Sequence, residues 1–172
     1  SCPIPLRPNM NDRPLPLRAL LLAPGGFALP AGLDAALMLL GVPAPIQAAR
    51  LTEVHGVLLA LGFVGTVIAL ERAVAARHPW GYLAPTFLGA GAVLLVTPAP
   101  RSLGSALLVA GSATLVAVYA SLWRRAADVA VLIQAAGAVL ATGGALLWLG
   151  GVPVPDLLPW LSGFLILTIA GE

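Results

Sequence analysis

The sequence predicts an all-α membrane protein, a bundle of about six transmembrane helices. Of its 172 residues, 59% are hydrophobic and only 9% are charged, whereas a soluble domain usually carries about a quarter charged residues. Apolar stretches of about 20 residues, enough to cross a hydrocarbon core as a helix, alternate with short breaks. Lipid cannot satisfy irregular backbone, and no alternation typical of barrel strands occurs, so these stretches are expected to be helices.

The order of the elements follows from these stretches. Residues 1–14 hold four prolines and two arginines, which predicts an irregular cytoplasmic tail. The helical bundle is expected over residues 15–172. Connections such as GVPAPIQAAR, TPAPRS and GGVPVPD combine Pro with Gly or Ser, which end helices, and their shortness implies antiparallel neighbours. The expected spans are 15–40, 51–76, 80–98, 103–123, 129–150 and 157–172.

The first span contains Pro24-Gly25-Gly26 and Pro30. Each proline removes a backbone donor, and the glycines between them weaken the helix, so a kink or a break is expected there. A broken span often lines a site, but the ordinary kink is the favoured interpretation because Pro and Gly are common in membrane helices.

Aromatic residues mark the expected membrane interfaces. An amphipathic ring prefers the headgroup level, and all four tryptophans stand near the end of a predicted span. They are Trp80, Trp123, Trp148 and Trp160, with Tyr82 beside the first.

The arginines predict the orientation of the bundle. Seven lie at the tail and at the second and fourth connections, and two lie on the opposite side. The positive-inside rule therefore places the seven-arginine side, with the N-terminus, in the cytoplasm of a bacterial inner membrane. The seven are Arg7, Arg13, Arg18, Arg72, Arg77, Arg124 and Arg125, and the two are Arg50 and Arg101.

Several function classes lack support in the sequence. Arginines scattered at span edges form no basic patch, so nucleic-acid binding is not expected. The single cysteine, Cys2, cannot form an internal disulfide. No nucleophile and base constellation, phosphate loop, CxxC or HExxH motif occurs, so hydrolytic and nucleotide-driven reactions are unsupported. The sequence names no catalytic residue, and an enzyme is not the favoured interpretation.

The second span carries a face of small residues. Helical spacing places His55, Gly62, Thr66, Ala69 and Ala73 on it. Such a face more often lets another helix approach closely, but it would also leave room for a flat cofactor beside the imidazole. As a packing face it predicts that Gly62→Leu disturbs assembly far more than Leu58→Phe.

Other polar residues within the spans are candidates for packing or function, because charges in a bilayer usually face protein, water or one another. Glu53 points about 200° away from His55 around the helix, so the two are not obvious partners. Asp34 is a candidate partner of Arg50 or part of a proton path. The remaining candidates are Glu71 and Arg72, expected as an interfacial pair, and Gln134, expected to hydrogen-bond between helices.

The runs EVHGVLLALGFVGTVIALERAVA, HPWGYLAP and FLILTIAGE resemble uncharacterised bacterial multi-span proteins distantly similar to the NnrS family. NnrS-like proteins have about twelve spans and bind haem and copper through membrane histidines, so the resemblance implies that this chain is an N-terminal half. The local similarity covers His55 and Gly62-Phe63. It implies that His55 is a metal-binding residue, as an axial ligand of haem b; EVHG offers one histidine where the family has two, which speaks against copper.

The expected function is therefore that of a haem-associated, redox-linked inner-membrane protein. Its expected partners are the lipid bilayer and either other membrane subunits or a missing C-terminal half. An accessory structural subunit of a respiratory or photosynthetic complex is the alternative, with its small-residue faces packed against partners. A transporter is the third possibility.

The arginine distribution predicts a topology that reporter fusions can measure. Fusions after Arg77 and Arg125 should report a cytoplasmic location, and fusions after Arg50 and Arg101 an extracytoplasmic one. The reverse pattern would contradict the predicted orientation.

Overall fold

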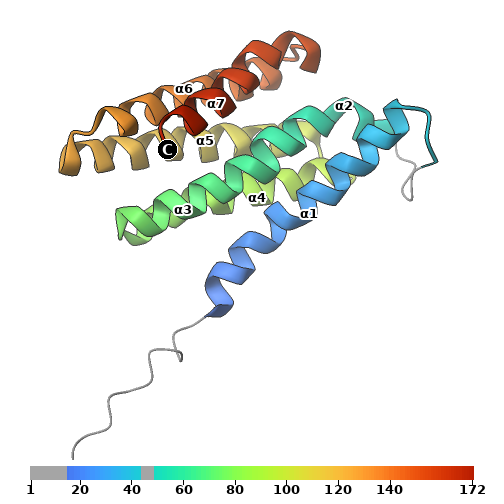
Figure 1. The fold of residues 1–172 in the computed structure, drawn as a ribbon. Helices are drawn as coiled ribbons and strands as arrows, with labels where there is room; N and C mark the ends of the chain where they lie inside the picture. Colours follow the sequence, from blue (N-terminus) through green and yellow to red (C-terminus); the bar gives the residue numbers. More distant parts are fainter. Residues whose placement is uncertain (1–14, 44–48) are drawn as a thin grey trace, which may run out of the picture.

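The computed structural model describes residues 15–43 and 49–172, and this part of the chain is all-α, as predicted (Figure 1). The expected tail, residues 1–14, lies outside the described residues. Short 3-10 turns at Pro79–Tyr82 and Val154–Leu157 precede α4 and α7. The helices are α1 Leu15–Leu39, α2 Ala49–Val57, a π-helical segment Leu58–Gly65, α3 Thr66–Ala76, α4 Leu83–Val96, α5 Arg101–Ala126, α6 Val129–Leu149 and α7 Leu158–Ala170.

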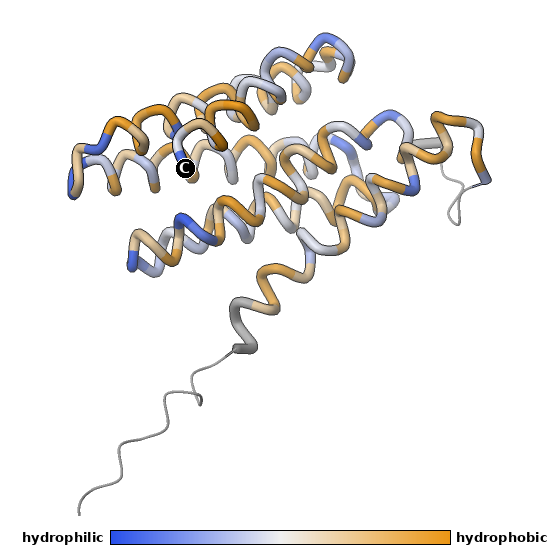
Figure 2. The backbone as a smooth tube through the Cα atoms, in the orientation of Figure 1, coloured by the Kyte–Doolittle hydropathy of each residue, from blue (hydrophilic) through white to orange (hydrophobic). Residues whose placement is uncertain are grey.

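Five helical stretches are long and apolar enough to cross a membrane: Ala19–Leu39, Leu51–Ala76, Pro79–Val96, Arg101–Ala126 and Val129–Leu149. The sixth apolar stretch, Val154–Ala170, is shorter. Large apolar side chains such as Leu20, Leu132 and Ile166 are exposed, and the hydrophilic residues gather mainly near the helix ends (Figure 2). This distribution is typical of a surface that faces lipid.

The helices pack largely in chain order. Helix α5 lies between α4 and α6, and α7 packs against α6 (Figure 1). Helix α1 packs against the second span, which is built from α2, the π-helical segment and α3, and also against α4. The result is a body of α1, the second span and α4, joined through α5 to the α6 and α7 pair.

Helix α1 runs without a break through Pro24 and Pro30, so the break considered for this span is absent. Its neighbours are small where the prolines and glycines lie. A side chain at Gly89 would meet the Pro24 ring at 2.9 Å, and one at Gly25 would meet Thr66 at 3.1 Å. Helix α1 therefore approaches the second span and α4 closely along its Pro24-Gly25 region.

The second span contains a feature that hydropathy did not reveal, the π-helical segment Leu58–Gly65. It lies between two ordinary α-helical parts, and Thr66 Oγ1 donates a hydrogen bond to the Gly62 carbonyl at 2.6 Å just where it ends. A π-helix winds more widely than an α-helix, is rare, and occurs frequently at functional sites. It also shifts the faces of the helix on its two sides relative to each other.

The small residues of the second span still face protein. Thr66, Ala69 and Ala73 are fully buried. A side chain on Gly62 would meet Ala92 at 2.9 Å and Ala28 at 3.4 Å. Leu58, one turn before Gly62, is also fully buried. Leu58→Phe would therefore overpack the core as well, so Leu58 is not a suitable control and the comparison of the two variants stays a prediction.

We expect Gly62→Leu to lower the thermal unfolding midpoint in detergent strongly, whereas Val67→Leu should leave it nearly unchanged. The first change forces side-chain atoms against α1 and α4, and overpacking of a filled interior costs about 1–3 kcal/mol. Val67 is 38% exposed on the same span and is the matched control. Equal midpoints for the two variants would contradict the close packing at Gly62.

Candidate functional site

A cavity of about 770 Å³ lies at one end of the bundle, where α2 and α5 begin and α6 ends. Its lining is mainly apolar, with Leu39, Val152 and Leu158 among the walls. The connection from α6 to α7, with its glycine and prolines over residues 151–155, closes part of it. The polar lining residues are Thr52, Glu53, His55, Arg101, Ser102 and Ser105, together with the indole of Trp148.

His55 lies on the wall of this cavity from the last turn of α2. Its ring is half-buried, and Nδ1 lies 3.0 Å from the Thr52 carbonyl oxygen one turn earlier. The tautomer with the proton on Nδ1 donates to this carbonyl, which leaves Nε2 as a lone-pair acceptor. The local helix therefore fixes the ring and leaves one nitrogen available for a ligand.

Arg101 and Glu53 form an ion pair beside His55. Arg101, the first residue of α5, donates from one terminal nitrogen to Glu53 Oε2 at 3.2 Å. Both side chains are largely exposed, so the pair contributes little to stability. Glu53 thus joins His55 at the cavity, although the spacing along the helix had not made them obvious partners.

Trp148 lies under the arginine. The guanidinium carbon of Arg101 lies 4.9 Å from the centre of the Trp148 ring, a cation–π contact. The indole is only 3% exposed, and its Nε1 has no hydrogen-bond partner within the described part of the chain. This burial contradicts its assignment to an aromatic belt, because a belt ring lies exposed at the headgroup level.

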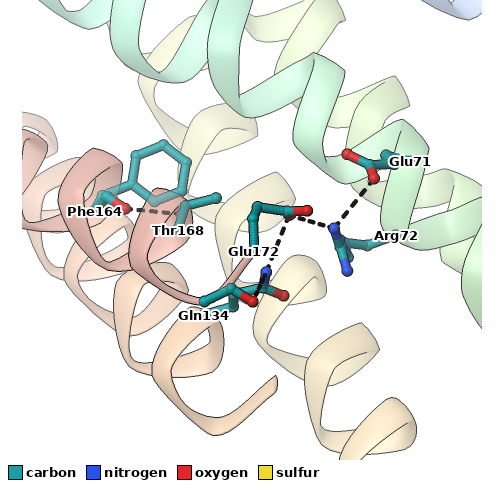
Figure 3. Close-up of polar contacts among 7 residues, drawn as sticks. Glu71, Arg72, Gln134, Phe164, Thr168 and Glu172 are labelled. Carbon is teal, nitrogen blue, oxygen red and sulfur yellow. Dashed lines mark hydrogen bonds and ion pairs between the residues drawn. The ribbon is translucent and has the colours of Figure 1, made fainter. Parts of the chain in front are cut away.

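A second polar cluster lies toward the opposite end of the second span (Figure 3). Arg72 pairs with Glu71 at 3.1 Å and also with Glu172. Gln134 donates from Nε2 to the Gly171 carbonyl at 2.9 Å and to Glu172 at 3.0 Å. The cluster thus links α3, α6 and the end of α7. Arg72 pairs with Glu71, as predicted, and also with Glu172, which the sequence did not suggest.

Besides Trp148 Nε1, two further buried side-chain atoms have no partner within the residues that the structure describes, the Tyr119 hydroxyl and Arg72 Nε. Tyr119 is fully buried in α5, within electrostatic range of Arg72, Glu71 and Glu172. Nothing in the sequence singled out this tyrosine, because a tyrosine in a membrane span usually serves packing.

The other predicted residues lie apart from the cavity. Gly62 and Thr66 belong to the packing face, and Asp34 is buried in α1. The Arg50 side chain lies outside the described residues, so its pairing with Asp34 stays a prediction. Nowhere in residues 15–43 and 49–172 do three or more His, Cys, Asp or Glu residues form a metal-binding group.

By the length and composition of its helices, the chain is a multi-pass membrane protein. It belongs to the family described as Domain of unknown function (DUF8744), whose model matches residues 18–172. No curated protein and no solved structure matched the chain. These comparisons show no link to NnrS, so that resemblance stays a prediction.

We expect Gln134→Leu to lower the unfolding midpoint, because it removes the hydrogen bonds from α6 to the end of α7. Hydrogen bonds between membrane helices contribute on average about 0.6 kcal/mol and at most about 1.7 kcal/mol. Thr142→Val is the control, since Thr142 on the same helix donates only to the Ala138 carbonyl of its own helix. A larger loss for Thr142→Val would contradict a linking role for Gln134.

Proposed function

We propose that this protein binds a flat amphiphilic cofactor, haem b, in the cavity, with His55 Nε2 as an axial ligand. One observation carries the proposal: the only histidine placed inside a predicted span lines a cavity of about 770 Å³ with Nδ1 already bonded to a carbonyl. A metal-binding histidine almost always donates its other ring N–H to such a group, which fixes the tautomer and orients the ring.

The cavity residues fit this group in two respects. Ligand pockets typically measure about 300–1,000 Å³ and are mostly apolar with a few polar groups, as is this one. Arg101 supplies a positive charge within the same lining. Haem, when bound, supplies one-electron chemistry, while this chain holds the imidazole and surrounds the ligand with apolar walls.

The proposal includes a location. Arg77, Arg124 and Arg125 are exposed at the end of the bundle opposite the cavity. Arg125 also donates to the Ala76 carbonyl at 2.6 Å, which joins the ends of α5 and α3. With the arginine-rich end in the cytoplasm of a bacterial inner membrane, the cavity opens toward the extracytoplasmic interface.

The alternative of an accessory structural subunit drew on the small-residue faces as surfaces for partners. In this structure α1 and α4 fill the face of Gly62 and Thr66. The α6 glycines Gly137 and Gly143 are likewise covered by α7, at Phe164 and Trp160. These faces are used within the chain, so they no longer favour that alternative, and no specific observation favours a transporter.

The deciding measurement is the reduced-minus-oxidised absorption spectrum of purified protein reconstituted with haem. We expect Soret and α-bands in the wild type that are lost or shifted in His55→Ala and unchanged in His78→Ala. His78 is the matched control because it is exposed in the turn after α3. A wild-type protein without bound haem, or equal spectra for both variants, would overturn the proposed function.

A further inference from the structure

We infer that the cavity recognises a carboxylate on its ligand, through the guanidinium of Arg101 and the indole N–H of Trp148. The inference rests on the proposed function in that it takes the same cavity as the binding site. It adds the chemical class of the ligand, an apolar body with an acidic group. It also gives a binding role to Arg101 and Trp148, which the sequence had related only to the orientation and the interfaces of the bundle.

Arg101 is held in place for such a contact. Its guanidinium carbon lies 4.9 Å from the centre of the Trp148 ring, a cation–π contact that restrains the group at the cavity. A guanidinium offers five N–H donors in a fork that matches a carboxylate, and Arg101 directs one terminal nitrogen to Glu53. Arg101 also begins α5, where the helix dipole favours negative charge.

The indole of Trp148 is the second, independent observation. A buried N–H without an acceptor is costly, because it loses its hydrogen bond to water and gains none in return. This indole is 3% exposed, lines the cavity, and finds no acceptor for Nε1 among the described residues. An acidic group placed beside the Arg101 edge would supply the missing acceptor.

Glu53 shows that the Arg101 guanidinium binds a carboxylate at this place in the cavity. It is a carboxylate of the chain itself, bound to Arg101 at 3.2 Å, and its side chain is 63% exposed at the cavity. A ligand carboxylate would replace it at Arg101 and release Glu53 to water. Glu53 therefore competes with the ligand, and this competition predicts opposite effects for changes at the two residues.

The test compares the dissociation constants of haem and of its dimethyl ester, which keeps the iron but lacks free carboxylates. We expect the wild type to favour the diacid by about tenfold, since one charge-assisted contact is of this order. The ratio of the affinity for haem to the affinity for its diester should fall to near one in Arg101→Gln. It should persist in part in Arg101→Lys and decrease several-fold in Trp148→Phe. It should increase in Glu53→Gln.

Arg77→Gln is the control, because it removes an exposed arginine at the opposite end of the bundle. Comparing the ratio of the two ligands within each variant cancels their different partition into detergent. Size-exclusion chromatography establishes that each variant is folded. Equal affinity of the wild type for haem and its diester would overturn the carboxylate inference and leave haem binding intact.

An iron-free pair of probes separates this inference from the proposed function if the wild type binds neither porphyrin. A dibromo fatty acid and its methyl ester quench tryptophan fluorescence on contact, and the signal of Trp148 is the difference between wild type and Trp148→Phe. Stronger quenching by the acid, lost in Arg101→Gln, would support the carboxylate site without haem. Equal quenching by acid and ester would overturn it.

Discussion

Three helices approach one another closely around Gly62, and this packing holds the bundle together. Lipid tails are as apolar as leucine, so apolar side chains alone give membrane helices little reason to associate, and van der Waals contact between small residues has to supply it. Gly62 lies against Ala28 of α1 and Ala92 of α4, while Gly89 receives the Pro24 ring. These contacts fix the second span inside the bundle.

Because the second span is fixed, both polar sites are fixed with it. His55 and Arg72 lie on this one span on either side of the π-helical segment, roughly 25 Å apart at the rise of an α-helix. The segment between them is itself largely inside the protein, with Leu58, Leu61 and Gly62 buried. The cavity and the Arg72 cluster thus lie at the two ends of the second span, whose middle is packed against α1 and α4.

The sequence was sufficient for the fold class, because apolar runs of spanning length leave few structures that lipid tolerates. It did not predict the π-helical segment, whose hydrogen-bond pattern has no signature in hydropathy. At the candidate site it singled out His55 and Glu53, but Arg101 and Trp148 appeared only as an orientation charge and an interface ring. Arg101 and Trp148 come into contact because α5 packs against α6. The spacing of residues along the chain does not predict this packing.

Both polar ends leave buried polar atoms without a partner among the described residues, Arg72 Nε and the Tyr119 hydroxyl at one end and Trp148 Nε1 at the other. They differ in their surroundings, because Trp148 lines the cavity and the Arg72 cluster lies apart from it. Near Arg72, residues of α3, α6 and the end of α7 supply partners for one another, with Gln134 binding both Gly171 and Glu172. At the cavity, the chain fixes the groups without satisfying them: Thr52 engages one nitrogen of His55, and Trp148 is buried with its N–H unbonded. An apolar residue in place of Trp148 would fill the same space without that cost. A cavity of about 770 Å³ beside a fixed imidazole and an unbonded indole N–H leaves room for a ligand to supply the missing partner, and this space directs the search for function to the His55 end.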